Sequence, residues 1–464
     1  MERSSLAGII LAAGKGTRMK SDLPKALHAV WGVPMAELIG RSLKCAGVSR
    51  PVIVVGHGGE SLIDALGKSY DYVWQHEQKG TGHAALMAAE FLRDHEGPVI
   101  VTPGDTPLLT GETLKKLAAQ HEESGANCTV ATVKLADPTG YGRIVRDDKG
   151  AVKGIVEHKD ASDAIREIDE VNSGIFCFNA RVLFEVLPKI KNDNAQGEYY
   201  LTDAVAAINE QGGVVRPFLH ADVEELSGVN DRWQLAEAAK GLRRRVLKGH
   251  ALNGVTIFDP DTTYIGIDVH IGRDTEIEPG TIIEGDTRIG ANCSIGPYSR
   301  IINAKIEDKC IVRMSHLNGA TMHKGARCGP FANLRPGAKL GEGAKVGNFV
   351  EVKNATLGQS VAVSHLSYIG DGAIGNDTNI GAGTIFCNYD GYQKHRTEVG
   401  EGVFVGSNTT LVAPVTIGDG AVIAAGSVIT HDVPKGALGV GRQRQEVKEE
   451  WAIHWRKRKQ LDKS

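Results

Sequence analysis

The chain has 464 residues, of which 41% are hydrophobic and 23% charged, and its formal net charge is −3. This length suggests about two to four domains, and the balanced charge argues against a chain-wide nucleic-acid binder. Seven widely spaced cysteines without a CxxC pair argue against a disulfide framework or a zinc ribbon. No apolar run approaches the roughly 18 residues of a membrane span, so we expect a cytoplasmic protein with free thiols.

The first half alternates apolar segments with polar or amphipathic ones. The apolar segments include residues 6–14 (LAGIILAAG), 51–57 (PVIVVGH) and 97–105 (GPVIVTPGD). This alternation is typical of a Rossmann-like α/β domain, in which helices flank a mixed, mostly parallel sheet and ligands bind at the carboxyl ends of its strands. Asp105 directly follows the third segment, where a hard oxygen ligand for Mg²⁺ is expected.

A glycine-rich loop follows the first apolar segment. It reads Gly14-Lys15-Gly16-Thr17-Arg18, and Pro24-Lys25 comes soon after it. Glycines let the backbone approach a phosphate, and free N–H groups with nearby Lys and Arg side chains supply positive field. The loop matches neither the Walker pattern nor the dinucleotide GxGxxG pattern. We therefore expect Arg18 and Lys25 to bind a triphosphate.

The second half carries a repeat of six residues and follows a connecting segment, residues 231–250, with helical periodicity. Isoleucine recurs at positions 265, 271, 277, 283, 289, 295 and 301, and the repeat continues with slips to Ile429. Period six indicates a parallel β-helix of hexapeptide repeats, left-handed in the known fold, with roughly nine coils over residues 265–433. A polar insertion, residues 388–398, is expected to project on a functional face.

Motifs along the whole chain resemble those of a known enzyme family. The opening LAAGKGTRM…LPK resembles sugar-nucleotide pyrophosphorylases, and EQKGTGHA, DPTGYGRI, GIVEHKDA, NAQGEYYLTD and GVNDR continue the likeness. With the β-helix, the chain resembles the bifunctional N-acetylglucosamine-1-phosphate uridylyltransferase / glucosamine-1-phosphate N-acetyltransferase family. The resemblance implies a uridylyltransferase domain over residues 1–230, a linker helix over 231–251 and an N-acetyltransferase β-helix with its tail over 252–464.

For the first domain, the resemblance implies transfer of UMP from UTP to N-acetylglucosamine 1-phosphate, with Mg²⁺ held by Asp105 and Asn230. Arg18 and Lys25 would be catalytic. Pro103 stands where many family members carry a tyrosine, so one hydroxyl contact to the ligand would be missing. The implied residues for UTP and the UDP-sugar are Leu11, Ala12, Ala13, Gly14, Lys25, Gln75, Gly80, Thr81, Pro103, Gly104, Asp105, Gly142, Glu157, Asn172 and Asn230.

For the second domain, the resemblance implies transfer of the acetyl group of acetyl-CoA to glucosamine 1-phosphate, with His365 as the base. Arg335 and Lys353 are eighteen residues apart, one full coil, so we expect them to stack on one face as a phosphate clamp. Tyr368 and Asn379 would contact the sugar. The implied acetyl-CoA residues are Ala382, Asn388, Tyr389, Ser407, Ala425 and Arg442.

Hexapeptide acyltransferases are typically trimers, so we expect a homotrimer with acetyltransferase sites at the subunit boundaries. Two alternatives remain at this point: a pyrophosphorylase whose β-helix is only a scaffold, and a binding subunit without catalysis. The tail pairs Trp451 and Trp455 with a basic run, Arg456–Lys459, which suits either an arm near the coenzyme or a packed helix with a solvated end.

Overall fold

A computed structural model describes residues 6–461. The chain divides into two compact units, one extending to Arg244 and the other beginning at Arg245, and each is described by itself. The boundary lies inside helix α10 (Arg232–Leu252), close to the expected linker helix. Among the described helices, none combines the length and the apolar content that crossing a membrane requires.

The first unit is built on a nine-stranded mixed sheet with strand order β11-β7-β10-β6-β1-β4-β5 and β8 and β9 at its side. Strands β6, β1, β4 and β5 run parallel, whereas β10 is antiparallel to both β6 and β7. The strands are β1 (Ala7–Leu11), β4 (Val52–Val55), β5 (Asp71–Trp74), β6 (Pro98–Pro103), β7 (Cys128–Lys134), β8 (Arg143–Arg146), β9 (Val152–Val156), β10 (Glu170–Asn179) and β11 (Val215–Leu219).

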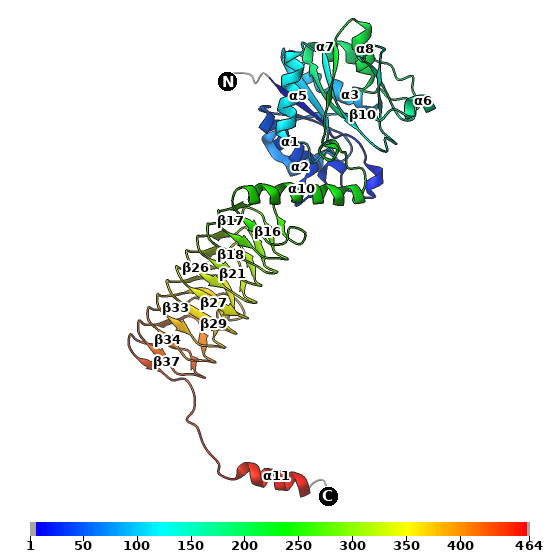
Figure 1. Cartoon of the computed structure of the whole chain (residues 1–464). Helices are drawn as coiled ribbons and strands as arrows, with labels where there is room; N and C mark the ends of the chain where they lie inside the picture. The colour runs from blue at the N-terminus through cyan, green and yellow to red at the C-terminus, as the bar shows by residue number, and fades with distance from the viewer. Residues whose placement is uncertain (1–5, 462–464) are drawn as a thin grey trace. The chain divides into compact units, whose positions relative to one another are not determined.

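Helices cover both faces of this sheet, and each face has its own apolar core (Figure 1). Strand β4 is buried along its whole length, and β1 and β6 are buried except at their ends, which explains why their sequences read as continuous apolar runs. The principal helices are α1 (Met35–Ala46), α2 (Gly59–Leu66), α3 (Thr81–Met87), α5 (Gly111–Glu123), α7 (Ala180–Val186) and α8 (Asp203–Glu210).

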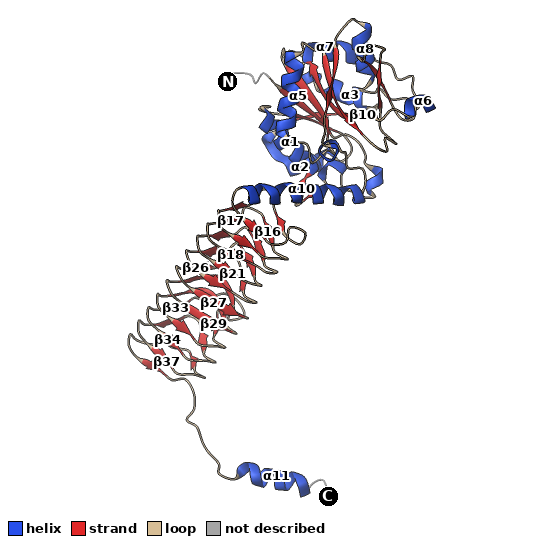
Figure 2. Cartoon of the chain, in the orientation of Figure 1, coloured by secondary structure: helices blue, strands red, loops and turns tan. Residues whose placement is uncertain are grey.

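The second unit is a parallel β-helix, and Figure 2 shows its short strands stacked coil upon coil. One face is an eleven-stranded parallel sheet, and the other two faces together form a seventeen-stranded sheet. The first sheet contains β12 (Thr256–Ile257), β15 (Glu276–Ile277), β18 (Ser294–Ile295), β21 (Ile311–Val312), β24 (Arg327–Cys328), β27 (Lys345–Asn348), β29 (Ala362–His365), β31 (Asn379–Ile380), β34 (Phe404–Val405), β37 (Val422–Ile423) and β39 (Leu438–Gly439).

The register of the strands confirms that the six-residue period belongs to the coils of a β-helix. Ile277 pairs with Ile295, and Val405 pairs with Ile423, so each coil places its aliphatic residue on that of the next coil. These side chains form one continuous narrow core. The strands extend beyond the expected 265–433 at both ends, from β12 to β39. The terminal coils depart from the regular spacing: Ile257 of β12 pairs with Ile277, and Gly439 of β39 pairs with Ile423.

Candidate functional site

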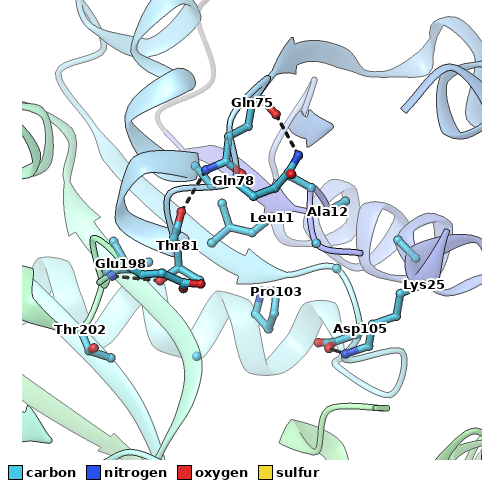
Figure 3. Close-up of a pocket in the computed structure, with 18 of the residues that line it drawn as sticks. Leu11, Ala12, Lys25, Gln75, Gln78, Thr81, Pro103, Asp105, Glu198 and Thr202 are labelled. Carbon is cyan, nitrogen blue, oxygen red and sulfur yellow. Dashed lines mark hydrogen bonds and ion pairs between the residues drawn. The ribbon is translucent and has the colours of Figure 1, made fainter. Parts of the chain in front are cut away.

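A cavity of about 700 Å³ opens at the carboxyl ends of β1 and β6 (Figure 3). This edge is where ligands bind in open α/β sheets. The cavity brings together most of the residues that the sequence predicts for the nucleotide. They are Leu11, Ala12, Ala13, Gly14, Lys25, Gln75, Gly80, Thr81, Pro103, Gly104, Asp105, Glu157 and Asn172.

The glycine-rich loop is shaped so that Lys25 can reach the cavity. Gly16 has φ of +59°, and a Cβ there would lie 2.5 Å from Cβ of Lys25. Any larger residue at position 16 would therefore be strained and would displace the lysine. At Gly14, by contrast, nothing lies within 4 Å of the Cβ position, so this part of the loop is open to an incoming ligand.

Four predicted polar side chains converge at the mouth of the cavity. The ammonium of Lys25 forms an ion pair with Asp105 and donates a hydrogen bond of 2.9 Å to Oδ1 of Asn230. Arg18 donates a second hydrogen bond, of 2.7 Å, to the same Oδ1. The Asp105 carboxylate and the Asn230 amide oxygen therefore face one shared cation. This donor set suits Mg²⁺, which prefers hard oxygen ligands.

The two oxygens would supply only part of the coordination of a magnesium ion. Within residues 6–461, no three His, Cys, Asp or Glu side chains cluster as candidate metal ligands. Magnesium commonly binds one or two protein carboxylate or amide oxygens and takes its other ligands from phosphate and water. Asp105 and Asn230 fit that pattern.

The opposite side of the cavity carries the residues predicted for the sugar. Thr202 donates a hydrogen bond of 3.1 Å to Oε1 of Glu157, and burial raises the pKa of that carboxyl group. Asn172 donates its backbone N–H to the carbonyl of Gly142 at 2.8 Å, which links the two predicted sugar residues. Thr202 was not among the sequence predictions, because it lies on a separate segment that only the fold brings to Glu157.

The edge predicted for uracil is ordered by local hydrogen bonds. Gln75 donates from Nε2 to the carbonyl of Gly80 at 3.0 Å, and His83 Nδ1 lies 2.9 Å from the same amide nitrogen. Thr81 Oγ1 accepts the backbone N–H of Leu201 at 3.0 Å. Among the polar residues that line the cavity, sequence reasoning also missed Lys15, Gln78 and Glu198.

In the β-helix, four predicted residues form one column along a single corner. Successive backbone hydrogen bonds place His365, Ala382, Ser407 and Ala425 at equivalent positions of consecutive coils. The Cβ position of Gly426, next to Ala425, lies 3.5 Å from Cδ of Arg442, so Arg442 covers the end of the same column. The fold therefore assembles the candidate base and most of the predicted coenzyme residues in one line.

Asn348 holds the imidazole of His365. The two residues pair in neighbouring coils, and Oδ1 of Asn348 lies 2.5 Å from Nδ1 of His365. An amide oxygen only accepts hydrogen bonds, so Nδ1 is the donor in this pair, and in the neutral ring Nε2 is then the acceptor. Sequence reasoning missed Asn348 because only its register with His365 identifies it, and the slips in the repeat hide that register.

The predicted phosphate clamp is on the neighbouring face. Arg335 and Lys353 occupy equivalent positions of adjacent coils, immediately after the pair Leu334 and Val352. Lys394, from the inserted loop, joins them: hydrogen bonding and like charge from Lys353 lower its pKa. Sequence reasoning did not include Lys394. Lys394 thus adds a third cation to the predicted pair, and Arg335 also forms an ion pair of 2.8 Å with Glu351.

The inserted loop is tied to the β-helix at its base. The side-chain amide of Asn388 donates to Asp371 at 2.5 Å and lies 3.5 Å from the hydroxyl of Tyr368. Burial tends to raise the pKa of Asp371, but hydrogen bonds from Asn354 and Asn388 bring it below its usual value. Tyr389 is exposed, and its hydroxyl donates to the carbonyl of Gly391.

Asn379 is the one predicted sugar residue on the other face. It begins β31, whereas Tyr368 begins β30 (Tyr368–Ile374) of the seventeen-stranded sheet. His365 likewise ends β29, so a corner separates His365 and Asn379 from the phosphate clamp. Within one chain, the predicted acetyl-transfer residues are therefore divided between two faces.

Comparisons with known proteins agree with this two-part architecture. The nucleotidyl transferase family matches residues 7–226, and the bacterial transferase hexapeptide family matches residues 268–303 and 396–431. Bifunctional protein GlmU of Staphylococcus haemolyticus is 51% identical and aligns with 95% of this chain and 98% of its own length. Its counterpart from Geobacillus thermodenitrificans is 48% identical over 97% of this chain and 98% of its own length. The chain thus belongs to the GlmU family of bifunctional proteins.

Proposed function

We propose that this protein makes UDP-N-acetylglucosamine at two sites. The β-helix acetylates glucosamine 1-phosphate with acetyl-CoA, and the α/β unit then transfers UMP from UTP to the resulting N-acetylglucosamine 1-phosphate. The observation that carries the proposal is the end-to-end match to bifunctional relatives, over 97% of this chain in the case of the Geobacillus protein. The assembled polar groups in both units support it.

In the first site, a phosphate oxygen of the sugar phosphate attacks the α-phosphorus of UTP, and the bond to the pyrophosphate leaving group breaks. The nucleophile is already an anion, so catalysis depends on positioning and charge neutralisation rather than on a base. Arg18 and Lys25 would bind the triphosphate oxygens, and Glu157 and Asn172 would hold the sugar.

Asp105 and Asn230 would hold Mg²⁺. When bound, the ion neutralises charge that develops on the phosphate oxygens. Lys25 now contacts both oxygens, so we expect its ammonium to turn to the triphosphate when the ion binds.

In the second site, Nε2 of His365 accepts a proton from the 2-amino group of the sugar. The amine nitrogen attacks the thioester carbonyl, a C–N bond forms and the C–S bond breaks, and the imidazolium of His365 returns the proton to the leaving sulfur to give the coenzyme A thiol. Asn348 keeps the ring in the tautomer that can accept this proton. Arg335, Lys353 and Lys394 would bind the phosphate of the sugar, and Arg442 would pair with a phosphate of the coenzyme.

We infer that the second site is completed between subunits of a homotrimer. A corner of the β-helix separates His365 from Arg335 and Lys353 in one chain. In a closed ring of parallel copies, His365 of one chain would face the phosphate clamp of its neighbour.

The test is an assay of the purified chain with each substrate set alone and then together. Glucosamine 1-phosphate with acetyl-CoA should release coenzyme A thiol, and N-acetylglucosamine 1-phosphate with UTP and Mg²⁺ should release pyrophosphate. All substrates together should give UDP-N-acetylglucosamine. Pyrophosphate release without thiol release would show instead a nucleotidyltransferase with a structural β-helix.

A further inference from the structure

His83 lies beside the edge of the cavity predicted for uracil, and neither the candidate metal site nor the phosphate contacts involve it. It is half-buried on α3, whereas Gln75 directly follows β5 and lines the cavity. Figure 3 shows Gln75 and Thr81 on one side of that cavity. The contact of 2.9 Å between Nδ1 of His83 and Nε2 of Gln75 therefore joins an imidazole without an assigned role to a residue predicted to read the base.

The carbonyl of Gly80 fixes which way the amide of Gln75 points. This oxygen lies 3.0 Å from the amide nitrogen of Gln75 and also accepts the backbone N–H of Ala84 at 3.1 Å. A carbonyl oxygen only accepts hydrogen bonds, so an amide oxygen in the place of Nε2 would be repelled. The NH₂ group of Gln75 is therefore the end of the amide that faces both Gly80 and His83.

The imidazole of His83 accepts the second hydrogen of this NH₂ group. An amide nitrogen only donates, so Nδ1 of His83 carries a lone pair, and the proton of the neutral ring lies on its Nε2. Burial, followed by the charge of Lys79, lowers the pKa of His83, whereas the charge and the backbone carbonyl of Glu77 act in the opposite direction. The net shift keeps the ring neutral near pH 7, as an acceptor must be.

Both acceptors belong to a segment that is held in place from the other side. The backbone N–H of Gly82 donates to the carbonyl of Tyr199 at 2.8 Å, and a Cβ at Gly80 would lie 2.5 Å from that same oxygen. Gly80 has φ of +108°, so glycine is needed there both for the conformation and for the close approach. Tyr199 thus fixes the start of α3 and, with it, the two acceptors.

Because its NH₂ group is engaged twice, Gln75 has only Oε1 left for the nucleotide. Within residues 6–461, no group donates to this oxygen, and the oxygen is not enclosed by protein. An acceptor at the base edge pairs with the N3–H of uracil. Cytosine has an unprotonated N3 at the same place, so two lone pairs would face each other and the base would be rejected.

We propose that His83 is the positioning residue that makes the nucleotide site select uracil over cytosine, because it locks the amide of Gln75 with its oxygen toward the base. The proposal rests on the proposed use of UTP and adds the residue that enforces it. If the amide turned over, Nε2 would donate to N3 of cytosine, so the same glutamine would accept the wrong base. His83 acts through Gln75 and needs no contact with the nucleotide.

The test measures the Kd of UTP and of CTP, each with Mg²⁺, for the full-length chain and its variants by calorimetry. His83→Ala and the bulkier His83→Leu leave Gly80 as the only acceptor, so we expect the preference for UTP over CTP to fall about tenfold. His83→Asn should restore the preference, because its Oδ1 lies close to the place of Nδ1 and accepts the same hydrogen. In uridylyl transfer, the KM of His83→Leu for UTP should rise with kcat little changed, since the base contact does not alter during the reaction.

The matched control is His95→Ala, which removes another half-buried imidazole of the first unit, one whose Nε2 lies 3.3 Å from the carbonyl of Pro98. It should keep the wild-type preference, and thermal unfolding checks the fold of each variant. The proposal would be overturned by a wild type that binds CTP as tightly as UTP, by a folded His83→Ala or His83→Leu protein with the wild-type preference, or by a His83→Asn protein that behaves like them. A preference for UTP in a chain that releases no pyrophosphate would instead count against the proposed function.

Discussion

Lys25 and His365 are each held by a partner that lies elsewhere in the sequence. Lys25 meets Asp105 and Asn230, which arrive from the end of β6 and from the segment before α10. Local motifs predicted all three, because each has a recognisable neighbourhood: a glycine loop, a strand end and the GVNDR stretch. The structure adds that the Lys25 ammonium contacts both Asp105 and Asn230, and that Arg18 donates to the same Asn230 oxygen.

The residues that sequence reasoning missed have no such local signal. Asn348 reaches His365 through the register of two coils, and Lys394 reaches Lys353 through the fold of an inserted loop. A repeat with slips of one residue does not fix which side chains are neighbours across coils. Only the paired strands settle that question.

Replacing Asn348 with Ala should slow acetyl transfer roughly 10-fold to 100-fold. The imidazole of His365 would still be present as the base, but it would lose the contact that orients it. Asn348→Asp should instead move the acidic limb of the pH–rate profile to higher pH, since a carboxylate stabilises the imidazolium. Steady-state kinetics over pH would measure both effects.

The control is a double-mutant cycle. If Asn348 acts through His365, then Asn348→Ala should cost almost nothing in a His365→Ala background, because the interaction it supports is already gone. Equal losses in the two backgrounds would mean that Asn348 has only a structural role.

At the scale of elements, periodicity predicted both architectures, the alternating α/β pattern and the coils. Periodicity did not predict which strands pair out of sequence order. No local sequence feature predicts that β10 runs antiparallel between β6 and β7. Antiparallel and parallel strands that are buried on both faces share the same apolar composition. The terminal coils at β12 and β39 were also missed, because Ile257 and Gly439 pair with Ile277 and Ile423 across coils of irregular length.

Helix α5 contributes a test of stability against pH. His121, buried on α5, lies with Nδ1 3.0 Å from Oγ1 of Thr129, and burial lowers its pKa to about 4. In the unfolded chain, His121 binds a proton below about pH 6.5. In the folded chain, it binds the proton only below about pH 4. Stability should therefore fall as pH drops through this window.

His121→Gln removes the titrating group and keeps a polar side chain beside Thr129. Calorimetry of the full chain should show the unfolding temperature of the first unit falling several degrees further between pH 7 and pH 4 in the wild type than in the variant. Parallel curves for the two proteins would contradict the burial of a neutral His121.

At the scale of the whole molecule, the two units have separate cores, and α10 belongs partly to each of them. Its first turns are bound to the first unit: Arg232 donates to the carbonyl of Met19, and Trp31 donates to that of Ala239. Gln234 also accepts the backbone N–H of Asn230 at 2.7 Å. The start of α10 therefore supports a candidate metal ligand.

A fragment of residues 1–250 should keep uridylyl transfer and lose acetyl transfer, since its core and the supports of Asn230 are intact. A fragment of residues 1–230 lacks Gln234 and Ala239 and should lose most of its activity. The measurement is the rate of uridylyl transfer by the two fragments at the same Mg²⁺ concentration. Equal activity would show that α10 has no part in the first site.

The account centres on two sites that catalyse their reactions independently, and the most direct test measures both reactions in Asp105→Ala and in His365→Ala. Asp105→Ala should abolish Mg²⁺-dependent pyrophosphate release and leave thiol release near that of the wild type. His365→Ala should lose roughly 10²–10⁴-fold in thiol release with uridylyl transfer unchanged. The account would be contradicted by an Asp105→Ala protein that still consumes UTP, or by a His365→Ala protein whose acetyl transfer stays close to the wild-type rate.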